Sequence, residues 1–192
     1  MLKSKRARVG AILASGVAAS TIGLTALTTG TATEAFAAGS PIWGTCTGAQ
    51  QGVIKSDVTL VGHSGQYVIT KLTDGITVPY DTATGLPTGR HLEQGIRITT
   101  GASPATIGLI QAETANENLT TCTFTFYRTT VRGVLQAYLQ IKLTNAKVVN
   151  YGLTGTPTTG AATSYTLVAQ HILRSWLVPN RSTSDDWSAP VG

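Results

Sequence analysis

The sequence predicts a mainly β domain, built as an antiparallel barrel or sandwich, with one α-helix near its middle. Long stretches of the 192-residue chain alternate apolar with polar residues, which is typical of strands that bury one face. Charged residues make up only 12% of the chain, and Thr, Gly and Val are abundant, as in β-rich domains. A Ser-Pro pair after the first strands gives the one good helix start.

The first 37 residues predict a cleavable secretory signal. Four cations and no acid precede Val9, an uncharged apolar run follows, and an A-x-A motif ends at Ala37. We expect cleavage between Ala37 and Ala38. The alternative is a membrane anchor, but Ser, Thr and Gly interrupt the run, and a spanning helix needs about 20 predominantly apolar residues.

Residues 38–192 then form a single domain. Cleavage removes four cations and one acid, so the formal charge falls from +5 to +2. That charge gives no electrostatic footprint for nucleic acid. No later segment is apolar enough to insert into a membrane, so we expect a secreted protein, extracellular or at the cell surface, or periplasmic where the cell has an outer membrane.

Two cysteines remain, Cys46 and Cys122. In an oxidising compartment such a pair is usually a disulfide, and the alternative is two buried free thiols. Without nearby histidines, two cysteines are too few for a structural zinc site.

The N-terminal half of the domain alternates short strands with turns. Asp74-Gly75 marks a kink or bulge in the third strand, and the turn-rich segment 79–91 is expected to be a long exposed loop. The strands are expected at 41–47, 53–61, 67–78 and 92–100.

The helix is expected over 104–114. Ser103 is a favoured N-cap, and Pro104 is favoured at the first helical position. The residues from Asn116 to Asn118 would end it.

The clearest strands follow the helix. Residues 121–128 alternate strictly, as do 135–143, where Asn145 shifts the phase before the strand continues to Val149. We expect a Thr/Gly/Pro loop at 152–160 and a polar tail over 181–192. The last strand, 164–178, would place these residues on one side: Tyr165, Leu167, Ala169, His171, Leu173, Ser175 and Leu177.

No pattern in the chain predicts catalysis. His63, His91 and His171 are not at metal-ligand spacing from one another, and no nucleophile or phosphate-loop motif is present. We interpret His171 as structural, His63 and His91 as exposed, and Asp185-Asp186 as a solvated turn. No enzymatic activity, metal or cofactor is expected.

The order of short motifs resembles the Hcp family, the tube protein of type VI secretion systems. Six segments carry the resemblance over roughly residues 41–190, in this order: GITVP at 75–79 with Asp81, Thr84 and Gly85, TGRH at 88–91, ASP at 102–104, FYR at 126–128, IKLTNAKVV at 141–149 and SDDW at 184–187.

The resemblance implies a compact antiparallel β-barrel of two sheets with one helix on its side, similar to phage tail-tube proteins. It implies subunits that form homohexameric rings, which stack into a tube beneath a VgrG spike and can carry effector proteins. It brings no catalytic residue and no cofactor. The long loop is then the expected ring-to-ring contact, with these candidates: Pro79, Asp81, Gly85, Gly89, Arg90 and His91.

The secretory signal departs from the family, because a type VI machine carries its own tube out of the cell. We therefore expect an Hcp-like subunit that assembles after export. A monomeric extracellular binding or adhesion domain on the same fold is the alternative, and a secreted hydrolase is a third possibility. Two polar strand faces suit either a wet lumen, a subunit interface or an ordinary solvent face: Thr121, Thr123 and Thr125, and Gln136, Tyr138, Gln140 and Lys142.

Overall fold

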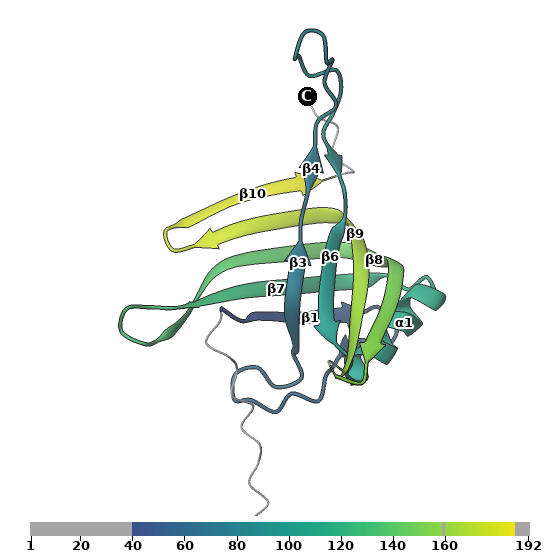
Figure 1. Ribbon diagram of the computed structural model, residues 1–192, viewed down its shortest axis with the longest axis vertical. Helices are drawn as coiled ribbons and strands as arrows, with labels where there is room; N and C mark the ends of the chain where they lie inside the picture. Colours follow the sequence, from purple (N-terminus) through teal and green to yellow (C-terminus); the bar gives the residue numbers. More distant parts are fainter. Residues whose placement is uncertain (1–39, 159, 187–192) are drawn as a thin grey trace, which may run out of the picture. The chain divides into compact units, whose positions relative to one another are not determined.

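The computed structural model describes residues 40–158 and 160–186, so the predicted signal and its cleavage site lie outside the described part of the chain. Its elements are, in chain order, β1 (Ile42–Gly48), β2 (Gly52–Ile54), β3 (Tyr67–Thr73), β4 (Ile76–Thr77), β5 (Leu92–Glu93), β6 (Ile96–Gly101), α1 (Pro104–Thr114), β7 (Leu119–Thr129), β8 (Leu135–Thr156), β9 (Gly160–Leu177) and β10 (Asn180–Asp186) (Figure 1).

The strands close into a barrel. The eight-stranded sheet runs in the order β10-β9-β6-β3-β1-β7-β8, with β2 beside β1, and β8 also pairs with β9, so that the sheet joins itself. A second, two-stranded sheet is formed by β4 and β5. All these pairings are antiparallel, which confirms the predicted fold class, an antiparallel β-barrel with an α-helix beside it.

Apolar side chains from the inner faces of the strands fill the barrel. Phe124 of β7, Leu143 of β8 and Leu167 of β9 are fully buried. Cys46 of β1 lies directly opposite Cys122 of β7, and the structure joins them in the disulfide that the sequence analysis favoured over two free thiols. Both cysteines are fully buried, so the disulfide is part of the core.

Helix α1 has the predicted bounds. Ser103 donates its backbone N–H to Thr106 Oγ1 at 3.0 Å, and Pro104 occupies the first helical position. Gly108 lets the helix approach β2 closely, because a Cβ there would lie 2.8 Å from Ile54 Cγ2. No helix in the described residues is long and apolar enough to cross a membrane.

Three predicted boundaries were wrong. The expected strand at 53–61 ends at Ile54, and the expected loop at 152–160 is the end of a hairpin, in which Gly152 pairs with Ser164 and Thr156 with Gly160. The expected polar tail forms β10 on the edge of β9. The hairpin end and β10 form because a partner strand supplies their hydrogen bonds. Local composition does not show which segments will pair.

The predicted face of β9 is also correct for only part of the strand. Tyr165 and Leu167 are buried as expected, but the next fully buried residue is Ile172, and His171 is partly exposed. β9 pairs with β6 up to Leu167 and with β10 from His171 onward. The strand changes neighbours between these residues, and the positions that face the core change there from odd-numbered to even-numbered residues.

Candidate functional site: a projecting arm and its ionic root

Residues 74–93, here called the arm, leave the barrel between β3 and β6. Within the arm β4 pairs with β5, so that Ile76 lies opposite Glu93 and Thr77 opposite Leu92. Figure 1 shows this pair and the segment between its strands extending beyond the barrel strands. The kink predicted at Asp74-Gly75 is the place where the arm begins.

The segment 79–91, predicted as a long exposed loop, is exposed and has main-chain pairing between its two sides. Tyr80 and Pro87 form an isolated antiparallel bridge, and the Thr88 N–H donates to the Pro79 carbonyl oxygen at 2.9 Å. These main-chain bonds continue the pairing of β4 and β5 outward. Main-chain pairing in the arm therefore extends from β4 and β5 to Asp81 and Leu86 near its tip.

Asp81 organises the turn at the tip of the arm. Its carboxylate accepts the Ala83 N–H at 2.8 Å, and its carbonyl oxygen accepts the Gly85 N–H at 2.7 Å. The hydrogen bond from the Ala83 backbone lowers the pKa of Asp81. Gly85 has a φ of +70°, a conformation that favours glycine. Asp81 and Gly85 were predicted as contact residues, and in the structure they shape the turn.

Large apolar side chains are exposed along the arm. Tyr80 and Leu86 at the tip are each 64% exposed. Three more lie on or beside the two short strands and are also exposed: Ile76, Val78 and Leu92. Because these side chains contribute little to the barrel core, their apolar surface is available to a partner.

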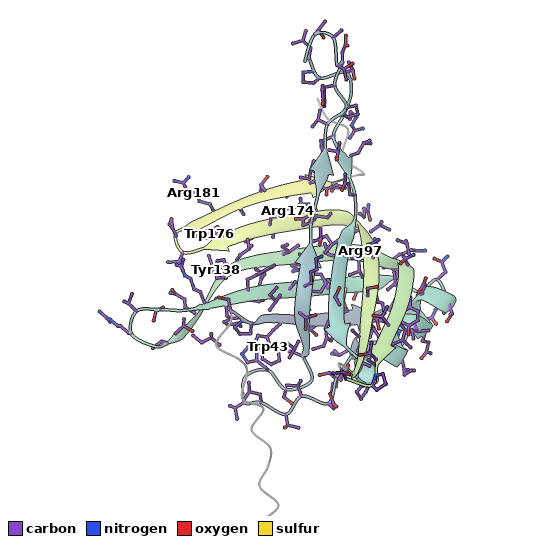
Figure 2. All side chains as sticks on the ribbon, viewed as in Figure 1. Trp43, Arg97, Tyr138, Arg174, Trp176 and Arg181 are labelled. Atoms are coloured by element: carbon purple, nitrogen blue, oxygen red, sulfur yellow. A yellow bond between two sulfur atoms is a disulfide. The ribbon has the colours of Figure 1, made fainter. Side chains whose placement is uncertain are left out.

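Arg174 of β9 fastens both sides of the arm to the barrel (Figure 2). Its Nε and Nη2 donate to the Asp74 carboxylate at 2.6 and 2.7 Å, where the arm begins. Its Nη1 and Nη2 donate to the Glu93 carboxylate at 3.1 and 2.9 Å, where the arm ends. One planar guanidinium thus holds two carboxylates in bidentate geometry.

This cluster is largely shielded from water. The Glu93 side chain is 3% exposed, so without Arg174 it would be a buried charge lacking its counter-ion. The hydrogen bond with Asp74, and then that with Glu93, raise the pKa of Arg174, so the guanidinium remains charged. The three residues form a fixed root for the arm.

A second ion pair ties the arm to β10. His91 Nε2 lies 2.8 Å from Asp185 Oδ2, and both side chains are partly buried. The hydrogen bond with His91 lowers the pKa of Asp185. The expectations of an exposed His91 and of a solvated turn at Asp185-Asp186 were therefore wrong, because β10 brings Asp185 to the arm.

The remaining candidates have simpler surroundings. Arg90 is exposed and lines a small hollow with His91, Leu92 and Asp185. A Cβ at Gly89 would make only ordinary contact, 3.8 Å from Pro79 Cγ.

No sequence pattern predicted that Asp74, Glu93 and Arg174 form a group. One signal was available: Arg174 is a charged residue inside a strand whose neighbours Ile172 and Leu173 are apolar, and such a position calls for a partner.

The root also gathers three side chains of metal-ligating type. One ligand atom each from His91, Glu93 and Asp185 lie within 4.8 Å of one another. Both Glu93 oxygens accept hydrogen bonds from Arg174, so a cation already balances this carboxylate. The arrangement is that of an ion-pair network.

The outer side of β1, β7, β8 and β9 is a hydroxyl-rich surface, here called the open face. Thr45, Thr123, Lys142 and Leu173 lie in one row across it. The polar members are all partly or fully exposed: Thr45, Thr47, Thr121, Thr123, Thr125, Gln140, Lys142, Thr144, His171 and Ser175. Lys142 is the one Lys or Arg among them.

His63 has a structural environment. Its ring stacks on Trp43 with 4.3 Å between ring centroids, and Nδ1 lies 2.9 Å from Gln66 Oε1. It is partly buried, so the expectation that it is exposed was wrong.

Comparison with known proteins gives consistent matches. Residues 45–171 match the family described as "Type VI secretion system effector, Hcp". The "Major exported protein" of Pseudomonas aeruginosa is 27% identical over 168 residues, covering 79% of this chain and 98% of that protein.

Solved structures agree with the fold. A "Crystal structure of Hcp protein" superposes with a TM-score of 0.73 at 21% identity, covering 79% of this chain and all of the other. The "Secreted protein Hcp3 from Pseudomonas aeruginosa" gives 0.67 at 21% identity, with the same coverage of both chains.

Proposed function

This chain belongs to the Hcp family of type VI secretion system effectors, and from that premise we propose that it is a structural subunit of a ring-based tube that assembles after export. In this proposal six copies form a ring, rings stack through the arm, and no catalysis is involved. Self-association of this kind needs surfaces that are exposed, apolar and fixed in position before the contact forms.

The arm is the observation that carries the proposal. It exposes Tyr80 and Leu86 at its tip, while Arg174 and its two carboxylates hold its base. A fixed apolar element loses little conformational freedom on binding, so more of its contact energy appears as affinity. Pro79, Asp81, Gly85, Gly89, Arg90 and His91 remain the predicted ring-to-ring contact residues, together with Tyr80 and Leu86.

The open face supports a second part of the proposal, in which it lines the lumen of the ring. Its side chains are mostly hydroxyl groups, and Lys142 is the cation named among them. Such a surface can stay hydrated, and it has few charges that would bind cargo tightly. Effector proteins carried in the lumen and a VgrG-like spike at the end of the tube are the partners we expect.

The disulfide supports assembly outside the cytoplasm. Cys46 and Cys122 are paired and fully buried, and disulfides of this kind form in oxidising compartments. Together with the predicted signal at residues 1–37, this favours export of each subunit before the rings form.

Sedimentation velocity and negative-stain electron microscopy of the exported, oxidised protein test the proposal. We expect particles of six subunits and, at higher concentration, stacks of rings. A protein that stays monomeric at every concentration would contradict the proposal and favour the alternative of an extracellular binding or adhesion domain.

A further inference from the structure

An aromatic and cationic strip lies at the end of the main sheet farthest from α1. We call it the distal end and define it by Phe126, Arg128, Tyr138, Trp176 and Arg181. Figure 2 shows Tyr138, Trp176 and Arg181 together at this end. Here β7, β8, β9 and β10 extend past Ile42, the first residue of β1, which pairs with Phe126.

Strand register brings these side chains to one face. Phe126 lies opposite Leu139, and a shift in the β7–β8 register follows directly, so that β8 has one extra residue, Tyr138, at this point. Trp176 lies opposite both Leu139 and Arg181. The alternation of the sequence predicted Tyr138 on the polar face of this strand. The register shift places it instead on the face with Phe126 and Trp176.

The aromatic rings contact one another and a guanidinium. Tyr138 packs edge-on against Phe126 at 6.3 Å and Trp176 at 5.2 Å between ring centroids. The Arg128 guanidinium carbon lies 5.4 Å from the centre of the Tyr138 ring. Trp176 is 38% exposed, and its Nε1 donates to the Val178 carbonyl oxygen at 2.7 Å, which holds the ring in place.

Charge separates the distal end from the rest of the domain. Residues 118–184 contain six Lys or Arg and no Asp or Glu. Arg174 is neutralised at the arm root, but Arg128, Arg132 and Arg181 have no acidic partner among the described residues. Trp, Tyr and Arg are the residues that dominate binding at protein interfaces, so this surface fits an acidic and partly apolar partner.

At the opposite end of β7, helix α1 offers one large exposed apolar side chain and one acidic side chain. Helix α1 precedes β7, and its Ile107 is 67% exposed. Glu113 on the helix is partly exposed and has no Lys, Arg or His within ion-pair distance among the described residues. The 11 residues of β7 separate the two surfaces by about 35 Å.

We infer that the distal end of one copy docks on the outer surface of α1 of the next copy. The inference rests on the proposed ring and names its side-to-side contact. The two surfaces differ and lie at opposite ends of the sheet, so the contact is heterologous and can repeat around a ring. The open face is left free to line the lumen.

Two variants of the full chain, exported and oxidised, test the contact. Arg128→Glu/Arg181→Glu reverses the charge of the distal end, and Ile107→Arg/Glu113→Arg reverses that of the helix. Each variant alone should sediment at the mass of one chain. Mixed in equal amounts they should again form rings, because one contact between unlike variants is unaltered and the other sets the introduced Glu side chains against the introduced Arg side chains.

Lys142→Glu is the matched control, since it reverses a charge on the same sheet away from the distal end. It should form rings like the unaltered protein. Circular dichroism and thermal unfolding should show that every variant folds.

Rings that persist in the distal-end variant would overturn the inference and leave the proposed function standing. So would a mixture that stays at the mass of one chain. An unaltered protein that never assembles would overturn the proposed function as well.

Discussion

The barrel and the arm of this domain are stabilised in different ways. In the barrel, fully buried apolar residues surround a buried disulfide, and each strand has hydrogen-bonded neighbours. The arm has two short strands and exposed apolar side chains, and its fixed position depends on ion pairs at Arg174 and His91. Stability should therefore depend mainly on the barrel and assembly mainly on the arm, so substitutions can separate the two.

Loss of the disulfide should have the largest effect on stability. Cys46 and Cys122 are 76 residues apart in sequence, and removing a cross-link of this kind typically costs about 2–4 kcal/mol. The free energy of unfolding of Cys46→Ala/Cys122→Ala, measured with urea, should fall by about that amount. If the urea midpoint of this variant equalled that of the unaltered protein in non-reducing buffer, the disulfide would not stabilise the barrel.

Arg174→Ala should loosen the arm and leave the barrel folded. The substitution leaves the buried Glu93 carboxylate without its donors, an effect worth about 1–3 kcal/mol. Hydrogen exchange of the amides in 76–92 should accelerate, while that of β7 and β8 stays as in the unaltered protein.

Arg97→Ala is the matched control for this experiment. Arg97 is an exposed cation on β6 with no acidic partner among residues 40–158 and 160–186, so its removal should leave arm exchange unchanged. Equal exchange in the arms of the Arg174 and Arg97 variants would contradict the role of the root.

Glu117 should make the barrel sensitive to acid. Its buried carboxylate accepts the N–H groups of Gln50 at 2.6 Å and Gln51 at 3.1 Å, and the bond from Gln50 lowers its pKa. Because the pKa of Glu117 is lower in the folded state, its ionised carboxylate stabilises the fold at pH values above the pKa of an unfolded Glu, about 4.3. This stabilisation is lost as the pH falls through the lower pKa of the folded state.

The free energy of unfolding of Glu117→Gln should therefore vary less with pH below about 5 than that of the unaltered protein. The two proteins should differ most at neutral pH and converge in acid. Parallel pH profiles would show that Glu117 titrates alike in the folded and unfolded states.

The smallest effect on stability is expected at the tip of the arm. Tyr80→Asp/Leu86→Asp changes two side chains that are each 64% exposed, so the free energy of unfolding should stay within about 0.5 kcal/mol. A loss of several times that amount would mean that the tip belongs to the cooperative core.

Sequence patterns predicted the parts of the fold that local chemistry determines. Ser103 and Pro104 gave the bounds of α1, and the alternation around Phe124 gave the buried face of β7. The arm was predicted as an exposed segment from its turn residues, but not as an ordered hairpin.

What the sequence could not predict depends on pairing between distant segments. Arg174 meets Asp74 from 100 residues away, and His91 meets Asp185 from 94 residues away. Tyr138 joins Trp176 only because the register between β7 and β8 shifts. Each contact follows from which strands are neighbours, and residue spacing along the chain does not encode that.

Electron microscopy of Tyr80→Asp/Leu86→Asp tests most directly whether the arm serves assembly while the barrel serves stability. Val61→Asp is the control, because Val61 is 95% exposed and lies outside the arm. We expect stacked rings from the unaltered and control proteins and single rings of the same size from the arm variant. Stacks of unchanged length in the arm variant would contradict the account.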